Sequence, residues 1–207
     1  MTLSRRAFMS MTAAGLLAPS VGRAAAPSPP YAPVRLENGR YAQPWFLNSF
    51  LELADDLAEA GANGKRFAIL WNQEGCPYCR ETHLVNFAIP EVTDYVRANF
   101  DMIQLDIWGA RTVVDFDGTE MSEKDLAKRN QVRFTPTIQF FPESFAATPP
   151  AGKAAEVARM PGYFRPFHFL TMFEYVRADG YAKGPFRKFL GDKVAALKAK
   201  GQGLPQW

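Results

Sequence analysis

The hydrophobic pattern after residue 46 begins with a helical repeat and continues with a short, wholly apolar run. From Ser49 onward apolar side chains recur at helical spacing with acidic residues between them, and Gly61 would end such a helix. Residues 67–71 (FAILW) are apolar throughout, and a run of that length predicts a buried strand. The folded part of the chain is therefore expected to open with a helix and a central strand.

The next stretch repeats this order. A loop over 72–75 precedes a helix that we expect to begin at Cys76-Pro77, because proline suits the first helical position, where its missing N–H would be unpaired anyway. Helical spacing over 91–99 then leads to a second apolar run, 102–108. This run predicts a second buried strand.

Turn and capping signals organise the following region. Residues 109–121 contain an Asp-Gly turn pair and predict a hairpin-like excursion. Ser122, with an acid three positions later, predicts the capped start of a helix over 122–130. The apolar run 136–141 is expected to be the third strand.

The last part of the chain predicts an edge strand over 156–161 and a helix over 166–178, closed by Gly180. A final amphipathic helix follows, which we expect to cover the sheet. Its apolar face consists of Phe186, Leu190, Val194 and Leu197.

This order predicts an α/β fold, a small three-layer sandwich in which helices flank a central mixed sheet. The first strands should be parallel, and the final pair antiparallel. We expect an extended, proline-rich arm over 27–46, the sandwich domain over 47–182, and a C-terminal helix and tail over 183–207.

Charge is concentrated at the N-terminus. The 207 residues carry a net charge of +3, but three of the 24 basic residues lie in the first 26 positions, which contain no acid. The remainder has 21 basic and 21 acidic residues, so nothing favours nucleic acid or an anionic membrane as a partner. No apolar run approaches the roughly 18–20 residues that span a bilayer, so no membrane anchor is expected.

Residues 1–26 have the features of an export signal. Arg5 and Arg6 precede a short apolar stretch, and small residues lead up to Ala26, where we expect cleavage. The paired arginines favour the twin-arginine type, and an ordinary signal of the general secretory route is the alternative. We therefore expect the mature protein in the periplasm, an oxidising compartment.

Cys76 and Cys79 are the only cysteines, and they carry the predicted chemistry. At a helix N-terminus, the partial positive charge and unpaired N–H groups stabilise a thiolate, which lowers the pKa of such a cysteine to roughly 3.5–7.5. Cys76 is the expected nucleophile, and Cys79, one turn further, the resolving thiol that completes disulfide exchange. A structural disulfide would close too small a loop to stabilise much. A zinc site would need further ligands, and the remaining histidines are His83 and the distant His168.

A second element is Thr135-Pro136, at the start of the third strand. Proline disrupts a strand ladder unless its position is special, and a cis bond here would bring Thr135 beside the sulfurs. The backbone of Thr135 would then be available to pair with an extended substrate segment. A trans proline at a strand edge is the alternative.

These motifs resemble the thioredoxin-fold superfamily over residues 65–176, which implies that the three-layer sandwich is thioredoxin-like. The chain is most similar to periplasmic SoxW-like thioredoxins, found with sulfur-oxidation systems. The resemblance rests on EGCPYCR at 74–80, DFDG at 115–118, VRFTPT at 132–137 and PGY at 161–163.

The resemblance implies a thiol–disulfide oxidoreductase without a cofactor or metal, which acts as a monomer. Cys76 and Cys79 would be catalytic, Thr135-Pro136 the cis-proline element, and Gly162 part of the substrate groove. Electrons would come from a membrane thiol transporter of the CcdA/DsbD kind and pass to disulfides of periplasmic proteins.

The sequence departs from thioredoxins proper at two places. Pro77-Tyr78, the spacer found in glutaredoxins, replaces Gly-Pro between the cysteines. These two residues tune the redox potential of the motif, so the potential of thioredoxins does not carry over to this chain. Leu70 stands where thioredoxins carry a buried acid, and Glu74 is expected to be a solvated loop residue instead of a substitute. We expect His83 to be a packed or exposed helix residue.

Two other functions remain open. A disulfide-forming oxidant would use the same dithiol, although such enzymes usually insert a sizeable helical domain before the cis-proline. A non-catalytic copper-delivery protein on the same fold is the second, but such proteins usually separate their cysteines by three residues. Copper retention without reductase activity would favour it.

Overall fold

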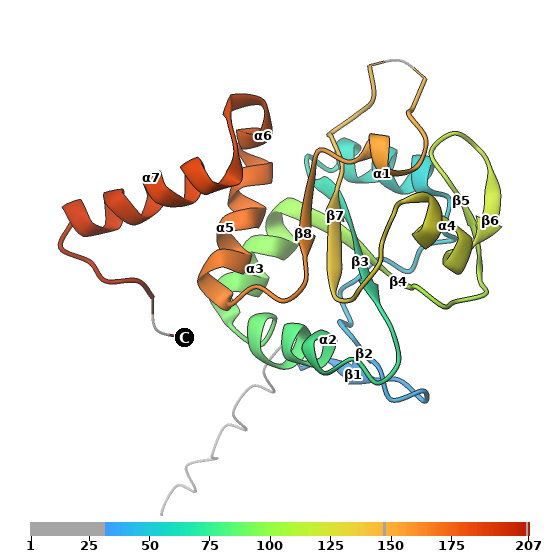
Figure 1. Cartoon of the computed structure of the whole chain (residues 1–207), viewed down its shortest axis with the longest axis horizontal. Coiled ribbons are helices and arrows are strands. Elements are labelled where there is room, and N and C mark those ends of the chain that lie inside the picture. Colours follow the sequence, from blue (N-terminus) through green and yellow to red (C-terminus); the bar gives the residue numbers. More distant parts are fainter. Residues whose placement is uncertain (1–31, 147, 206) are drawn as a thin grey trace, which may run out of the picture.

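A four-stranded mixed sheet forms the centre of the computed structural model, which describes residues 32–146, 148–205 and 207 (Figure 1). The strand order is β4-β3-β7-β8; β3 and β4 are parallel, and β7 pairs antiparallel with both β3 and β8. Their bounds are Arg66–Asn72 for β3, Phe100–Asp106 for β4, Thr137–Phe140 for β7 and Ala158–Pro161 for β8. The predicted mixed sheet, with an antiparallel final pair, is confirmed.

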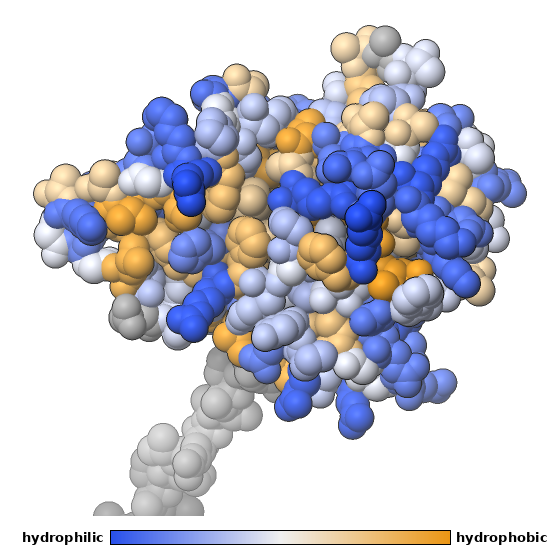
Figure 2. Space-filling view, in the orientation of Figure 1, coloured by the Kyte–Doolittle hydropathy of each residue, from blue (hydrophilic) through white to orange (hydrophobic). Residues whose placement is uncertain are grey.

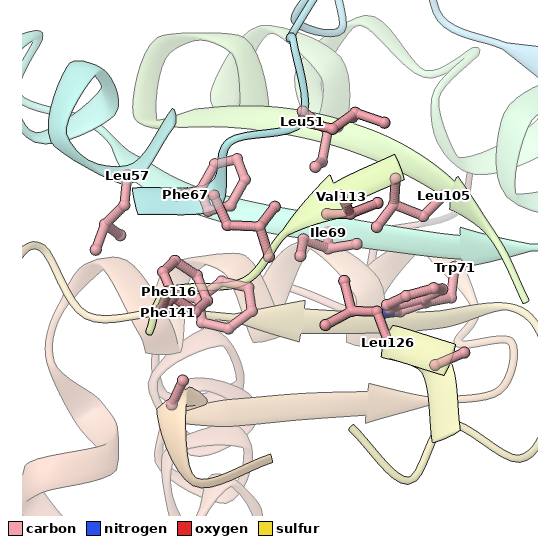
Figure 3. Packing of buried hydrophobic residues seen from close by; sticks show 14 of the residues in the cluster. Leu51, Leu57, Phe67, Ile69, Trp71, Leu105, Val113, Phe116, Leu126 and Phe141 are labelled. Carbon is pink, nitrogen blue, oxygen red and sulfur yellow. The ribbon is translucent and has the colours of Figure 1, made fainter. Parts of the chain in front are cut away.

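Two hydrophobic clusters fill the space between the sheet and its helices, because alternate side chains of the buried strand β3 point to opposite faces. On one face, Phe67, Ile69 and Trp71 pack under α1 (Leu53–Ala62) and α4 (Glu123–Arg129), as Figure 3 shows. On the other face, Leu70 packs under α3 (Pro90–Asn99) and α5 (Pro166–Arg177). The predicted three-layer sandwich is confirmed.

The second strand lies two residues earlier than predicted. The chain leaves the ladder after Asp106, whose carboxylate accepts a hydrogen bond from the Trp108 backbone N–H at 2.9 Å. This turn leaves Trp108 65% exposed at the end of the sheet. The excursion that follows is a hairpin of β5 (Thr112–Val114) and β6 (Glu120–Ser122), as predicted. Ser122 caps α4 by accepting from the Asp125 N–H at 3.1 Å.

The segment expected to be an extended arm contains a short hairpin where the structure describes it. β1 (Val34–Arg35) pairs antiparallel with β2 (Tyr41–Ala42), and Gly39 in the connection has a φ of 77°. The segment then runs along β4, where the Leu47 N–H donates to the Met102 carbonyl at 2.8 Å. The arm therefore covers the edge of the sheet. The predicted export signal, 1–26, lies outside the described residues.

The C-terminal helices differ from the prediction in two ways. Gly180 opens α6 (Gly180–Lys183) and does not close α5, because Asp179 adopts the left-handed conformation (φ 51°) that breaks the helix. The last helix, α7 (Phe186–Ala199), projects from the sandwich and does not cover the sheet (Figure 1). It packs on Tyr175 of α5 through its first turn, and Lys193 further along pairs with Glu174 of α5. Apolar side chains gather along it at the surface (Figure 2). Across the described residues, no helix is both long and apolar enough to cross a membrane.

Gly109 allows a close approach that a larger residue would prevent. A Cβ there would lie 2.0 Å from Oε2 of Glu123, a side chain 2% exposed. Glu123 is held in place because Oε1 accepts from the Asp106 N–H at 2.9 Å and from the Arg111 guanidinium at 2.6 Å. We expect Gly109→Ala to lower the free energy of unfolding by about 2 kcal/mol, as strained or overpacked substitutions do. Denaturant unfolding measures this change.

A matched control is Gly191→Ala in α7. A Cβ at this position has nothing within 4 Å, and the helix interior favours alanine over glycine. The control should raise the free energy of unfolding by about 0.5–1 kcal/mol. Equal effects of the two substitutions would contradict the role given to Gly109.

Candidate active site

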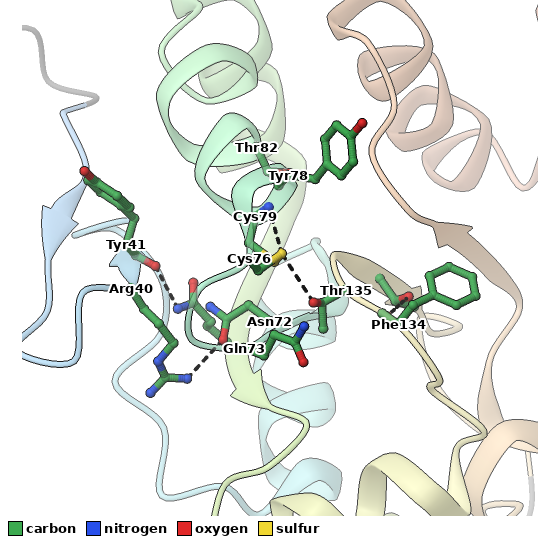
Figure 4. Close-up of a disulfide and its surroundings, with 12 residues drawn as sticks. Arg40, Tyr41, Asn72, Gln73, Cys76, Tyr78, Cys79, Thr82, Phe134 and Thr135 are labelled. Atoms are coloured by element: carbon green, nitrogen blue, oxygen red, sulfur yellow. Dashed lines mark hydrogen bonds between the residues drawn. A yellow bond between two sulfur atoms is a disulfide. The ribbon is translucent and has the colours of Figure 1, made fainter.

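The two cysteines lie where the chain passes from β3 into a helix (Figure 4). Cys76 is the N-cap of α2 (Pro77–Glu81), and Pro77 occupies the first helical position, as the sequence predicted. The helix continues into a π-helical turn, η1 (Thr82–Asn86). Cys76 and Cys79 are joined as a disulfide, with their Cα atoms 5.3 Å apart.

The sulfur of Cys76 accepts hydrogen bonds from two donors. The backbone N–H of Cys79 lies 3.1 Å from Cys76 Sγ, and the hydroxyl of Thr135 lies 3.3 Å from it on the other side (Figure 4). Cys76 is half-buried, whereas Cys79 is only 6% exposed. Donors that stabilise a negative sulfur therefore surround the outer cysteine, and the inner one is shielded from solvent.

The third strand brings Thr135 and Pro136 to the sulfurs. The Thr135–Pro136 peptide bond is cis, as predicted. The Pro136 carbonyl accepts from the Gly162 N–H at 2.8 Å, so the end of β8 is tied to this loop. Among the described residues, none hydrogen-bonds to the backbone of Thr135. This backbone is therefore accessible for pairing with a further extended segment.

Aromatic side chains flank the dithiol. Tyr78, 59% exposed, stacks on Tyr163 with ring centroids 5.8 Å apart, and the Tyr163 hydroxyl lies 3.1 Å from the side-chain oxygen of Asn86. Phe134 is exposed on the loop before the cis bond. The role of Tyr163 escaped the sequence analysis because it depends on a contact between segments some 80 residues apart along the chain.

The sequence also did not predict a buried polar group on the helix that carries the cysteines. His83, expected to be a packed or exposed helix residue, is 1% exposed. Its Nδ1 lies 3.3 Å from Nε2 of Gln43, which the arm supplies. Burial lowers the pKa of His83 to about 4, although the neighbouring Gln104 amide opposes this shift. His83 is therefore neutral at pH 7. The side chains of His168 and Glu74, in contrast, are exposed to solvent. Within the part of the chain that is described, no three His, Cys, Asp or Glu side chains lie close enough to hold a metal ion.

The hydroxyl of Thr135 should help to stabilise the Cys76 thiolate. We expect Thr135→Val to shift the pH midpoint of Cys76 alkylation in the reduced protein upward by about 1 unit, because one donor to a charged acceptor is lost. Thr135→Ser keeps the hydroxyl and should stay close to the native midpoint. The exposed Thr112 supplies a control, Thr112→Val, and a Thr135→Val midpoint equal to that control would contradict the assignment.

Comparisons with known proteins agree with this geometry. A protein-family model described as a thioredoxin-like domain matches residues 53–177. Among solved structures, a thioredoxin-fold protein from Helicobacter pylori is 22% identical, with a TM-score of 0.50, and the match covers 67% of this chain and 86% of that one. At this identity the likeness is evidence for the fold.

Two further solved structures are similar over comparable lengths. A thioredoxin from Thermus thermophilus is 26% identical with a TM-score of 0.47, over 65% of this chain and 90% of that one. A DsbH oxidoreductase is 13% identical with a TM-score of 0.38, over 70% and 92% of the two chains. No curated protein matches the chain.

Proposed function

The chain belongs to the thioredoxin-like domain family, and on this basis we propose that it is a periplasmic thiol–disulfide oxidoreductase that reduces disulfides in other proteins. The observation that carries the proposal is the placement of the Cys76–Cys79 pair. Cys76 is half-exposed at a helix N-terminus with two donors on its sulfur, and Cys79 is buried one turn behind it.

The exchange takes place in two steps. In the reduced protein the Cys76 thiolate attacks one sulfur of a substrate disulfide, forms a mixed disulfide, and releases the other substrate sulfur as a thiolate, which takes a proton from water. Cys79 then loses its proton and attacks Cys76 Sγ. The bond to the substrate breaks, the substrate leaves with the electron pair, and the Cys76–Cys79 disulfide forms. The substrate has gained two electrons and two protons.

The surface around the dithiol suits an extended polypeptide. The unpaired backbone of Thr135 offers a donor and an acceptor for strand addition, and Gly162 leaves the adjacent edge open because no atom lies within 4 Å of the position of its Cβ. The stacked pair Tyr78–Tyr163 forms an apolar wall for side chains of that segment. We therefore propose protein disulfides as the substrate class.

The cellular setting of the proposal rests on the sequence. The twin-arginine signal over 1–26, with cleavage near Ala26, supports export to the periplasm. The SoxW-like motifs support a role in sulfur oxidation, in which a membrane thiol transporter of the CcdA/DsbD kind re-reduces the Cys76–Cys79 disulfide. A periplasm is kept oxidising, so a reductant there needs such an external electron source.

The equilibrium potential of the Cys76/Cys79 couple tests the proposed direction. We expect a value near the roughly −270 mV of thioredoxin, measured against a dithiothreitol buffer and read from alkylation of both thiols. A value near about −120 mV, typical of DsbA, would instead make the protein an oxidant. Stoichiometric copper retention with no reductase activity would overturn the enzyme assignment altogether.

A further inference from the structure

Three polar side chains from three separate elements form a cluster inside the fold, in which Gln43 and His83 are buried and Gln104 is half-buried. Gln43 comes from the arm, His83 from η1 and Gln104 from β4. The amide nitrogen of Gln43 is 3.3 Å from His83 Nδ1, and the amide nitrogen of Gln104 donates to the Tyr41 carbonyl at 2.9 Å. In the described structure, three buried atoms of this cluster have no hydrogen-bond partner: Gln43 Oε1, His83 Nε2 and Gln104 Oε1.

The unpaired atoms match the needs of a protonated histidine. An imidazolium carries an N–H on both ring nitrogens and requires two acceptors. The Gln43 amide nitrogen lies against Nδ1 and also donates to the His83 backbone carbonyl at 3.4 Å, so a rotation that presents the Gln43 oxygen to a protonated Nδ1 gives up that second bond. Gln104 lies beside the ring closely enough to favour its protonated form. The unpaired Oε1 of Gln104 is therefore an acceptor in the surroundings of the ring that its protonated form can use.

His83 is placed to exchange a proton with the inner cysteine. Cys79 and His83 are four residues apart on one continuous helix, which is π-helical from Thr82, so they project from neighbouring positions on the same side. Both side chains are buried. Gln104 is paired in register with Leu70 of β3, the strand that leads to the cysteines, and its amide nitrogen donates to the Tyr41 carbonyl (Figure 4). The helical spacing therefore places His83 on the side of the helix that carries Cys79.

We propose that His83 accepts the proton of Cys79 during the second step of disulfide exchange, and that Gln43 and Gln104 hold the resulting imidazolium. The inference rests on the proposed function. The Cys79 S–H bond breaks, its proton passes to the ring directly or through one bridging water, and the thiolate attacks Cys76 Sγ. The substrate sulfur leaves with the electron pair of the broken disulfide bond, and the proton returns from His83 through solvent to the released thiolate.

Electrostatics favours this route over ionisation of Cys79 alone. A lone buried thiolate is costly, whereas transfer to a neighbouring ring leaves a net-neutral pair. The low pKa of His83 arises from burial, with no charged residue among its causes, so a thiolate beside it would raise that pKa. On the adjoining segments, Arg40 and Asp106 are paired with each other at 3.1 Å and do not compete.

A two-phase reaction separates the two cysteines. Mixing the reduced protein with dithiobis(nitrobenzoate) releases one coloured thiolate when Cys76 attacks and a second when Cys79 resolves the mixed disulfide. The second leaving group needs no proton, so its rate reports the ionisation of Cys79. We expect His83→Gln to slow the second phase at pH 7 on the order of 100-fold, as the loss of a general base does, and to leave the first phase within about twofold.

The pH profile of the second-phase rate distinguishes a role of His83 in proton transfer from a purely structural role. The second phase of His83→Gln should recover at high pH, where Cys79 ionises without help, and His168→Gln, at the other histidine, should match the native protein throughout. Gln104→Met removes one acceptor of the imidazolium and should slow the second phase by about tenfold, which provides a test if His83→Gln fails to fold. An unchanged second phase in these variants would overturn the role of His83 but leave the proposed function standing. Absence of the first phase in the native protein would also overturn the proposed function.

Discussion

A Cys76→Ser variant is expected to lose all catalytic reduction of protein disulfides. A serine hydroxyl is not ionised near neutral pH, so the donors from Cys79 N–H and Thr135 would have no thiolate to stabilise. Insulin reduction, followed by turbidity in dithiothreitol, should fall to the rate of dithiothreitol alone. The position is half-exposed and serine caps helices well, so the variant should remain folded by circular dichroism.

The matched variant Cys79→Ser should behave differently. Its outer thiol still attacks, but no second thiol completes the exchange, so substrates accumulate as mixed disulfides on Cys76. Non-reducing electrophoresis and mass spectrometry should detect these adducts, and Cys76→Ser should form none. If both variants fail to form adducts, or if both retain turnover, the two-step scheme is wrong.

The local chemistry of the site was predictable from the sequence because it depends on neighbours in the chain. The cap at Cys76, the proline at 77 and the buried position of Cys79 follow from where a helix begins. The cis bond before Pro136 was predictable from its place at a buried strand beside the dithiol motif. The assigned catalytic roles of these residues stay predictions.

Contacts between distant segments decide the features that the sequence did not predict. The hairpin in the arm did have a signal, since Asn38-Gly39 is a favoured turn pair, and the proline content around it hid that signal. The sequence carries no signal for the direction of α7, because its amphipathic pattern fits a helix lying on the sheet as well as one that projects from α5. The burial of His83 likewise depends on Gln43 and Gln104, which the sequence separates widely.

The stability of the oxidised protein should depend on pH through His83. Its pKa is lowered to about 4 in the folded state from 6.5 in the unfolded chain, so the native protein binds fewer protons between these values. The contribution of the neutral ring is complete above pH 6.5 and is lost as the pH falls to 4. We expect about 3 kcal/mol of unfolding free energy to be lost across this window from this group.

Urea unfolding at pH 7 and pH 4 isolates this contribution when the native protein is compared with His83→Gln. The carboxylates titrate in both proteins, so the native protein should lose about 3 kcal/mol more than the variant, whatever the stability of the variant at pH 7. His168→Gln should lose as much as the native protein, because His168 is exposed. Equal losses in the native protein and His83→Gln would mean that the ring already protonates near its ordinary pKa when folded. The site around His83 would then be more hydrated than its burial implies. The ring could accept a proton near its ordinary pKa, without a neighbouring thiolate to raise that pKa.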